Sequence, residues 1–296
     1  MNVVFSPRYR IDIGRHVFPT RKYELVHARL LHDGVITSSD VIEPQPASWD
    51  DLGLVHTHEY LRRLRDGTLS EEEAAQIALP WSREMVDGFR TMVGGTIETA
   101  RRAVLGRALV AHVGGGLHHA FANHGEGFCP FNDVAVAIRV LQRDCGVERV
   151  AVIDLDVHHG NGTAFIFESD PRVFTFSMHQ QHNYPMWKPR GSLDVGLADG
   201  TGDAEYLRLL EDALPKVMAS APDVLFYLAG ADPYEDDQLG GLRLTREGLR
   251  ARDRLVIEQA RRSALPMAIV LAGGYARSVE DTVAIHVATI GEAATG

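Results

Sequence analysis

A run of four apolar residues at 150–153, Val-Ala-Val-Ile, is followed at once by Asp-Leu-Asp-Val-His-His, and this abrupt change most constrains the fold of the 296-residue chain. An uninterrupted apolar, β-branched run indicates a strand buried on both faces, since a half-exposed strand would alternate polar and apolar side chains. Similar runs cover 108–113, 223–229 and 267–272, and helical patterns separate them. Because alternating strands and helices form parallel sheets, the sequence predicts an α/β fold with a mostly parallel central sheet and helices on both faces.

Capping residues indicate where three of the intervening helices begin. Asn132, Asp203 and Thr245 each precede an apolar pattern with helical spacing, and their side chains can accept hydrogen bonds from first-turn amides. Pro215 lies inside the second of these patterns, where its missing N–H is expected to kink or end the helix.

Polar clusters follow all four apolar runs. They are Gly-Gly-Gly-Leu-His-His at 114–119, the segment 154–161, Asp232 after Ala-Gly-Ala, and Gly-Gly-Tyr at 273–275. Ligands of open α/β sheets bind outside the carboxyl ends of the strands. The four clusters are therefore expected to converge on one crevice.

Two of these clusters predict a metal site. Asp156 and His158 point to the same side of an extended backbone, because side chains alternate along it. With Asp232 they provide two carboxylates and one neutral imidazole, which offset the charge of a divalent cation. Three protein ligands leave positions open for water and substrate, which is typical of a catalytic site. The ligand types favour zinc, with ferrous iron as the competing candidate.

The composition argues for one domain over residues 1–296 and against nucleic acid or a membrane as a partner. No Ser/Gly/Pro-rich linker or charge block divides the chain. The formal net charge of −10 and the scattered arginines disfavour nucleic acid, whose phosphates require clustered Lys and Arg. No segment resembles a signal peptide or approaches the roughly 18 apolar residues of a membrane span. With two cysteines, Cys129 and Cys145, a disulfide framework is not expected, and a reducing cytoplasm is predicted.

Together these motifs resemble those of the zinc-dependent histone deacetylase superfamily, most closely its class IV branch and bacterial histone-deacetylase-like amidohydrolases. The resemblance covers nearly the whole chain, with further matching segments at 55–60, 94–96, 125–133, 159–163 and 239–242. It implies an arginase/deacetylase-like fold and an enzyme that removes acetyl or longer acyl groups from lysine side chains of proteins by metal-activated water. Arginases place a further Asp after the Asp-x-His motif to hold a second metal. His159 follows it here, which favours one ion.

The same resemblance implies roles for single residues. His119 would be the general base and later the acid for the leaving amine, with His118 as its electrostatic partner. Tyr275 would polarise the amide carbonyl through its hydroxyl, and Asp154 would orient His118. Asn161 stands where many class I members have Asp beside His119, and a neutral amide should leave His119 less basic than a carboxylate would.

The resemblance also extends to the substrate and to a second ion. Three residues would line the tunnel for the acyl-lysine stem: Gly127, Phe128 and Tyr184. Five residues would hold a structural potassium ion: Asp154, Asp156, His158, Ser177 and Met178. Class IV-like relatives include members that prefer long fatty acyl groups. Decanoyl-lysine is therefore expected to be at least as good a substrate as acetyl-lysine.

Two other functions stay open on the sequence alone. One is hydrolysis of a small acylated amine such as an acetylpolyamine, for which the acidic run 235–237 would provide a rim that attracts a cation. The other is a catalytically silent protein that binds acyl-lysine. It is disfavoured because the metal ligands, both histidines and the tyrosine are all present.

Overall fold

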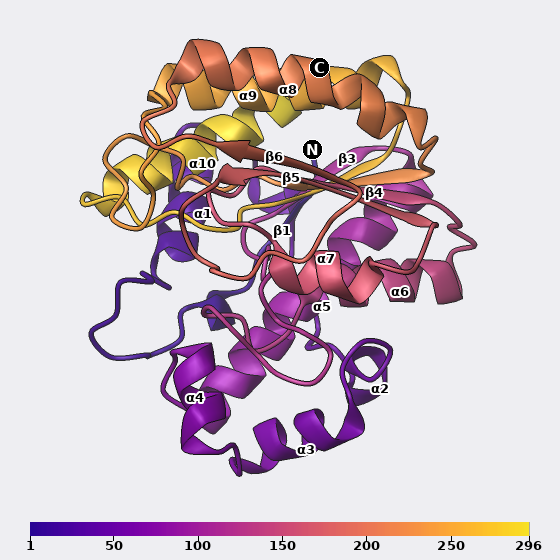
Figure 1. Ribbon diagram of the computed structural model, residues 1–296, viewed down its shortest axis with the longest axis vertical. Helices are drawn as coiled ribbons and strands as arrows, with labels where there is room; N and C mark the ends of the chain where they lie inside the picture. Colours follow the sequence, from indigo (N-terminus) through magenta and orange to yellow (C-terminus); the bar gives the residue numbers. More distant parts are fainter. Residues whose placement is uncertain (296) are drawn as a thin grey trace.

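The computed structural model describes residues 1–295, in which eight parallel strands form one sheet at the centre of the molecule (Figure 1). The strands are β1 (Val3–Val4), β2 (Val41–Ile42), β3 (Leu109–His112), β4 (Val150–Asp154), β5 (Val173–Gln180), β6 (Leu193–Leu197), β7 (Val224–Leu228) and β8 (Met267–Val270). Their order across the sheet is β2-β1-β3-β8-β7-β4-β5-β6, so the four predicted runs form its middle. Every pair is parallel, which confirms the predicted α/β sheet.

Helices cover both faces of the sheet, as predicted (Figure 1). One layer consists of α1 (Lys22–His32), α8 (Asp203–Ala219), α9 (Arg246–Arg262) and α10 (Val279–Ala294). The other consists of α5 (Arg83–Gly106), α6 (Asp133–Asp144) and α7 (Asn161–Phe167). Several short elements come before α5 in the chain. They are the helices α2 (Trp49–Leu52), α3 (His58–Asp66) and α4 (Glu71–Ile77) and the 3-10 turns Pro7–Tyr9 and Ser38–Asp40.

Strand β4 shows why the middle of the sheet is apolar. All five of its residues are buried, with β5 on one side and β7 on the other. Full burial of a Val or Ile side chain contributes about 1.5–3 kcal/mol, so the apolar run itself favours this central position. The strand ends at Asp154, which pairs in register with Ser177 of β5. The polar cluster that follows is thereby placed at the carboxyl end of the sheet.

Two of the three helix starts agree with the capping pattern, and the third differs. The Asn132 side chain accepts from Ala135 N, and the Thr245 hydroxyl accepts from Gly248 N. Asp203 does not cap α8: it is the first residue of that helix, after Gly202. Its carboxylate instead accepts from the backbone N (2.9 Å) and hydroxyl (2.7 Å) of Thr245, and so joins the starts of α8 and α9.

The sequence predicted that Pro215 would kink or end its helix, and the structure shows that it does not end it. Helix α8 continues through Pro215 to Ala219. Pro215 lies on the exposed side of the helix, where the carbonyl of Glu211 that loses its partner can bond to water. Leu214 and Val217 on the opposite side are buried and hold the last turn against the sheet.

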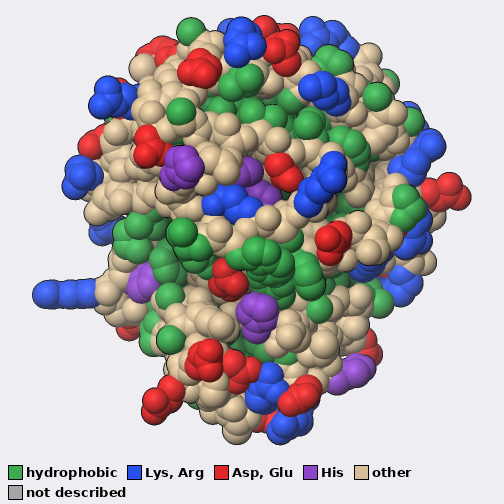
Figure 2. Space-filling model, viewed as in Figure 1, with side chains coloured by type: hydrophobic (Ala, Val, Ile, Leu, Met, Phe, Trp, Pro, Cys, Tyr) green, Lys and Arg blue, Asp and Glu red, His purple; other side chains and the backbone are tan. Residues whose placement is uncertain are grey.

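The surface carries charges of both signs. On the face shown in Figure 2, Lys and Arg side chains alternate with Asp and Glu, and a group of apolar side chains lies near the centre. Within residues 1–295, no helix is both long and apolar enough to cross a membrane.

Candidate metal and catalytic site

Three predicted metal ligands meet at the carboxyl ends of β4 and β7. Asp156, His158 and Asp232 are all buried, and each offers a ligand atom within 4.8 Å of the others. Nδ1 of His158 lies 3.0 Å from Oδ1 of Asp156 and 3.4 Å from Oδ2 of Asp232. The structure therefore brings together the three residues that the sequence singled out.

The electrostatics of this cluster fit a cation. Burial, together with the charge of Asp156, raises the pKa of Asp232 to about 7. Burial would lower the pKa of His158, but its interactions with the carboxylates of Asp156 and Asp232 outweigh it and raise that pKa to about 10. Oδ2 of Asp232 is buried without a hydrogen bond. Two carboxylates that compete for protons in this way, with an unpartnered oxygen, fit a divalent ion such as Zn²⁺ or Fe²⁺.

Backbone amides hold the two carboxylates in place. Gly273 N donates to Oδ2 of Asp156 at 2.8 Å, and Val157 N donates to Oδ1 of Asp232 at 2.9 Å. A Cβ atom at Gly273 would collide with Oδ2 of Asp232, so this close approach requires glycine. The glycine after β8 thus belongs to the same site as the ligands after β4 and β7.

A glycine turn after β3 delivers the histidine pair. Gly115 and Gly116 have φ of +74° and +84°, and a Cβ at Gly116 would come within 2.6 Å of the Cα of Ala272. The buried carboxylate of Asp133 accepts from Gly116 N (3.0 Å) and Leu117 N (2.7 Å). These bonds fix the turn directly before His118.

The two histidines have different partners. Nδ1 of His118 lies 2.7 Å from Oδ2 of Asp154, and Nδ1 of His119 lies 2.7 Å from Oδ1 of Asn161. Their Nε2 atoms are 3.1 Å apart. Both predicted partners, Asp154 and Asn161, are therefore in contact with the predicted ring.

Those partners separate the basicity of the two rings. Burial would lower the pKa of His118, but the charges of Asp154 and Asp156 outweigh it and raise that pKa to about 9. Burial and the nearby charges of His118 and His158 hold the pKa of His119 well below its usual range. A neutral His119 that donates from Nδ1 to Asn161 keeps the lone pair of Nε2, as a general base requires.

Tyr275 is held by its backbone. Its N–H donates to Oδ2 of Asp237 at 2.7 Å, and its carbonyl accepts from Gln238. The other oxygen of Asp237 accepts from Leu239 N and Gly240 N, and the side chain is buried. Asp237 is therefore not part of an acidic rim, as the sequence had suggested for residues 235–237. It holds the segment that carries Tyr275.

A pocket of about 510 Å³ leads from the surface to these groups. It is lined by Ala75, Gln76, Ala78, His119, Glu126, Gly127, Phe128, His158, Asn183, Tyr184, Leu239 and Tyr275. All three predicted tunnel residues are in this lining. The ring of Tyr184 lies 5.0 Å from that of His119, and the ring of Phe128 lies 6.1 Å from that of Tyr275.

The wall around Phe128 depends on α4. Gly127 N and Phe128 N donate to the carbonyls of Gln76 (3.0 Å) and Ile77 (2.9 Å), which end that helix. Phe128 has φ of +66°, a conformation that a bulky side chain adopts at a cost of about 1–3 kcal/mol. The two hydrogen bonds to α4 hold it there. This contact joins residues 51 positions apart and has no signal in the local sequence.

The residues of the predicted potassium site also lie close together. Asp154 and Ser177 are paired on neighbouring strands, and Met178 follows in β5. The Ser177 hydroxyl lies 3.0 Å from Nδ1 of His179. These positions leave the potassium ion as a prediction from the resemblance.

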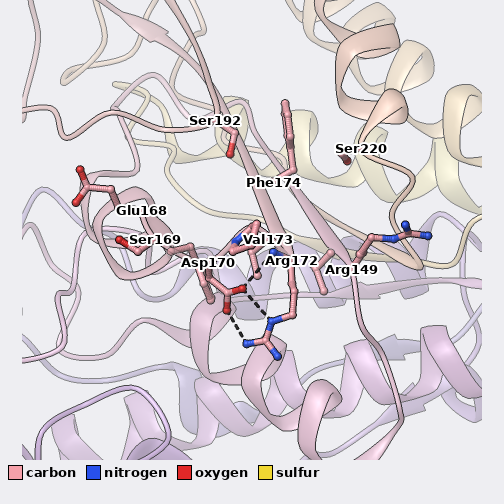
Figure 3. Close-up of a pocket in the computed structure, with 12 residues that line it drawn as sticks. Arg149, Glu168, Ser169, Asp170, Arg172, Val173, Phe174, Ser192 and Ser220 are labelled. Carbon is pink, nitrogen blue, oxygen red and sulfur yellow. Dashed lines mark hydrogen bonds and ion pairs between the residues drawn. The ribbon is translucent and has the colours of Figure 1, made fainter.

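A separate pocket of about 250 Å³ lies at the amino ends of the strands, opposite the candidate site (Figure 3). It adjoins Val150 and Val173, the first residues of β4 and β5. Arg172 bonds to Asp170 across it, as the dashed lines in Figure 3 show. None of the candidate ligands or catalytic residues lines this pocket, so it is not part of the site.

Sequence reasoning missed three acidic residues that support the site: Glu126, Asp133 and Asp237. Glu126 and Asp133 lie in the segment 125–133, which matched the family pattern without a role for either carboxylate. Asp237 was assigned to a rim. Each acts on residues of a distant segment, and spacing in the sequence does not reveal such contacts.

Comparisons with known proteins identify the family of this chain. Residues 16–290 match the family model described as the histone deacetylase domain. An uncharacterized protein of Picosynechococcus sp. is 44% identical over 286 residues, which cover 96% of this chain and 95% of that protein. Histone deacetylase 2 of Arabidopsis thaliana is 32% identical over 292 residues (94% and 75%), and the acetoin utilization protein AcuC of Bacillus subtilis is 32% identical over 266 residues (82% and 68%).

The crystal structure of the HDA15 HD domain matches with a TM-score of 0.81 at 24% identity, over 98% of this chain and 90% of that one. This likeness confirms the arginase/deacetylase-like α/β fold.

Proposed function

This chain belongs to the histone deacetylase family of deacetylase hydrolases, and we propose that it removes acetyl groups from lysine side chains of proteins or peptides, with zinc as its metal. One observation carries the proposal: a single pocket brings His119, His158 and Tyr275 to its inner end and the rings of Phe128 and Tyr184 to its walls. A lysine side chain has an apolar stem and a terminal amide when acetylated. Aromatic walls suit the stem, and the polar end suits the amide.

In this mechanism Asp156, His158 and Asp232 would hold the metal, which when bound polarises the amide carbonyl and makes water a stronger acid. With its proton on Nδ1, His119 is unprotonated at Nε2, where it accepts a proton from the attacking water and later returns it to the leaving amine. The Tyr275 hydroxyl donates to the oxygen on which negative charge develops.

His118 has an electrostatic role beside the base. Its Nδ1–H donates to Asp154, which orients the ring and stabilises its protonated form. The resulting positive charge lies 3.1 Å from Nε2 of His119, measured between the two Nε2 atoms. It favours the negatively charged transition state and opposes early protonation of His119.

The space beyond the ligands favours a short acyl group. A cavity of about 30 Å³ lies there, with Leu117, Cys129 and Ala272 among its lining residues. A volume of this size holds about two water-sized groups, which suits an acetyl methyl. We therefore propose acetyl-lysine as the substrate, in place of the long-chain preference that the class IV resemblance had led us to expect.

The acidic residues near the mouth do not favour a cationic small amine. Asp237 is buried against backbone amides, and Asp236 pairs with Arg277 at 3.3 Å. None of the residues 235–237 lines the pocket. The one carboxylate in the lining apart from the metal site, that of Glu126, already accepts two hydrogen bonds.

A structural potassium ion is a second, smaller proposal. Asp154, the last residue of β4, lies in register with Ser177 inside β5, and Met178 follows Ser177. Oxygen atoms on adjacent strands suit a large monovalent cation.

Substrate class is tested by the specificity constants of the zinc-loaded protein. We expect kcat/KM for an acetyl-lysine peptide to exceed that for an acetylated polyamine by on the order of 10-fold or more, because the pocket has no acidic rim to bind the positive charges of the polyamine. A preference for the polyamine would refute the protein substrate and support the small-amine alternative. Absence of hydrolysis of either by protein with one zinc per chain would refute both.

A further inference from the structure

One carboxylate connects the predicted base to the predicted tunnel wall. Oε1 of Glu126 accepts from Nδ2 of Asn161 at 2.9 Å and from the hydroxyl of Tyr184 at 2.6 Å. Its other oxygen lies 3.6 Å from Nε2 of His124. Oδ1 of Asn161 in turn lies 2.7 Å from Nδ1 of His119.

The bond to Asn161 determines which way its amide points. An amide has one donating and one accepting end, and a carboxylate accepts only. With its NH₂ group on Glu126, Asn161 must present oxygen to His119. Nδ1 of His119 must then carry the proton, which leaves Nε2 free on the pocket side. Without Glu126, the flipped amide would direct an N–H toward His119 and favour the wrong tautomer.

The bond to Tyr184 holds the wall. Tyr184 belongs to the loop between β5 and β6, and its side chain is 38% exposed. Its ring packs edge-on against His119 and His158, at 5.0 and 6.2 Å between centroids. The hydroxyl bond to Glu126 fixes an exposed ring that would otherwise sample several rotamers.

The environment keeps Glu126 ionised. Burial would raise its pKa, but the nearby ring of His124 and the hydrogen bonds from Tyr184 and Asn161 outweigh it and lower that pKa below the usual value. An ionised carboxylate has no proton to donate, so its oxygens only accept. This suits an oxygen that must hold two donors at once.

We propose that Glu126 is a positioning residue for the deacetylase reaction: it acts through Asn161 on the tautomer of His119, and through Tyr184 on the wall of the substrate pocket. The proposal rests on the proposed function, because it concerns the same pocket. It predicts that the two branches can be separated by experiment, with one affecting turnover and the other substrate binding.

The first test compares three glutamate variants with wild type on an acetyl-lysine peptide. Glu126→Ala should lower kcat about 10- to 100-fold, as is typical for loss of a group that orients a catalytic side chain, and should raise KM. Glu126→Gln keeps an oxygen that can accept both bonds and should stay within about 3-fold of wild type. Glu98→Ala, which removes a carboxylate ion-paired with Arg102 on α5, is the matched control and should leave both constants unchanged.

Two results would overturn the proposal. Glu126→Ala that retains wild-type kcat and KM would show that Glu126 positions nothing. Glu126→Gln as impaired as Glu126→Ala would show that charge, rather than the direction of the hydrogen bonds, matters. Tyr184→Phe should raise KM more than it lowers kcat, because it removes the wall branch alone; a larger effect on kcat would contradict the division into branches.

A double-variant cycle tests whether Glu126 acts through Asn161. Asn161→Asp alone places two carboxylate oxygens where a 2.9 Å hydrogen bond now lies, so kcat/KM should fall at least 10-fold. Adding Glu126→Gln restores a donor opposite the new carboxylate and should recover most of that loss. Effects that simply multiply would mean that the two residues are not coupled, and would refute the connection.

A readout independent of activity separates this proposal from the proposed function. Ring-nitrogen NMR spectra should show His119 protonated at Nδ1 in zinc-loaded wild type and Glu126→Gln, and a mixture of tautomers in Glu126→Ala. If wild type hydrolyses no acyl-lysine yet shows this difference, the function fails and the positioning role stands. If wild type is active and the spectra are alike, only the positioning role fails. Zinc content and melting temperature establish whether each variant is folded. If Glu126→Ala does not fold, the Asn161→Asp and Glu126→Gln cycle and the Tyr184→Phe variant still test the two branches.

Discussion

Carboxylates at the two ends of the sheet have opposite surroundings. At the carboxyl end, within residues 1–295, neither Asp156 nor Asp232 forms a salt bridge with Lys or Arg. At the amino end, Asp170 accepts from Arg139 at 2.6 Å and from Arg172 at 2.8 Å (Figure 3). The pKa of Asp232 is raised to about 7, whereas hydrogen bonds from Arg172 and Arg139 hold the pKa of Asp170 well below its usual range.

This difference separates a functional site from a structural pair. A carboxylate that is buried without a fixed cation destabilises the metal-free fold, so such a group persists only where a ligand compensates it. A carboxylate between two arginines needs nothing further. At the carboxyl end the partners of Asp156 and Asp232 are imidazoles, which can release a proton when a cation binds, whereas at the amino end Asp170 is paired with guanidinium groups, which keep their charge.

The largest expected effect is loss of a metal ligand. Asp156→Ala should abolish binding of the single ion per chain and lower kcat/KM on the order of 10³-fold or more, because the metal supplies several kcal/mol of transition-state stabilisation. Elemental analysis and circular dichroism should show metal-free but folded protein. Asp170→Asn at the other end of the sheet is the control and should keep both metal and activity. Two tightly bound ions per wild-type chain, or full activity after exhaustive chelation, would refute the mononuclear site.

A smaller effect is expected at Tyr275, whose hydroxyl donates to the substrate in the proposed mechanism and which is not one of the three candidate metal ligands. Tyr275→Phe should lower kcat on the order of 10²-fold, as is typical for loss of one oxyanion donor, with metal content unchanged. Steady-state kinetics and elemental analysis measure the two quantities on one sample. Turnover near wild type would assign Tyr275 to packing against Phe18 and Phe128.

Acyl length tests whether the inner cavity is closed. A decanoyl chain would have to displace the residues around a cavity of about 30 Å³, and overpacking of this kind costs about 1–3 kcal/mol. We expect kcat/KM for a decanoyl-lysine peptide to be about 10-fold lower than for the acetyl-lysine peptide. An equal or higher value for decanoyl would show that the cavity opens, and would restore the long-chain expectation drawn from the sequence.

The sequence predicted the floor of the site better than its walls. Asp156 and His158 are two residues apart in extended backbone, so their common direction follows from local geometry. The same holds for strands β3, β4, β7 and β8, whose apolar runs need no knowledge of the rest of the chain. Their convergence follows from the rule that parallel strands present their carboxyl ends together.

The walls depend on contacts between distant segments. Glu126 meets Asn161 across 35 residues, and Asp237 meets Tyr275 across 38. Neither pair has a spacing that predicts contact. The acidic run 235–237 was interpreted as a rim because its charge is visible in the sequence, whereas the burial of Asp237 is a property of the folded chain.

The smallest effect is expected at the amino end of the sheet, and it concerns stability. The folded-state pKa of Asp170 is depressed relative to an unfolded value of about 3.9, so its arginine pairs stabilise the protein above that pH and lose their contribution as pH falls through the folded-state pKa. Because Arg172 is solvent-exposed, screening limits the contribution to about 1 kcal/mol or less. Asp170→Asn should therefore melt about 2 °C below wild type at pH 7, and this difference should shrink below pH 4. A difference that persists unchanged at pH 3 would mean that Asp170 acts through its hydrogen-bond geometry alone, and would weaken the contrast between the carboxylates at the two ends of the sheet.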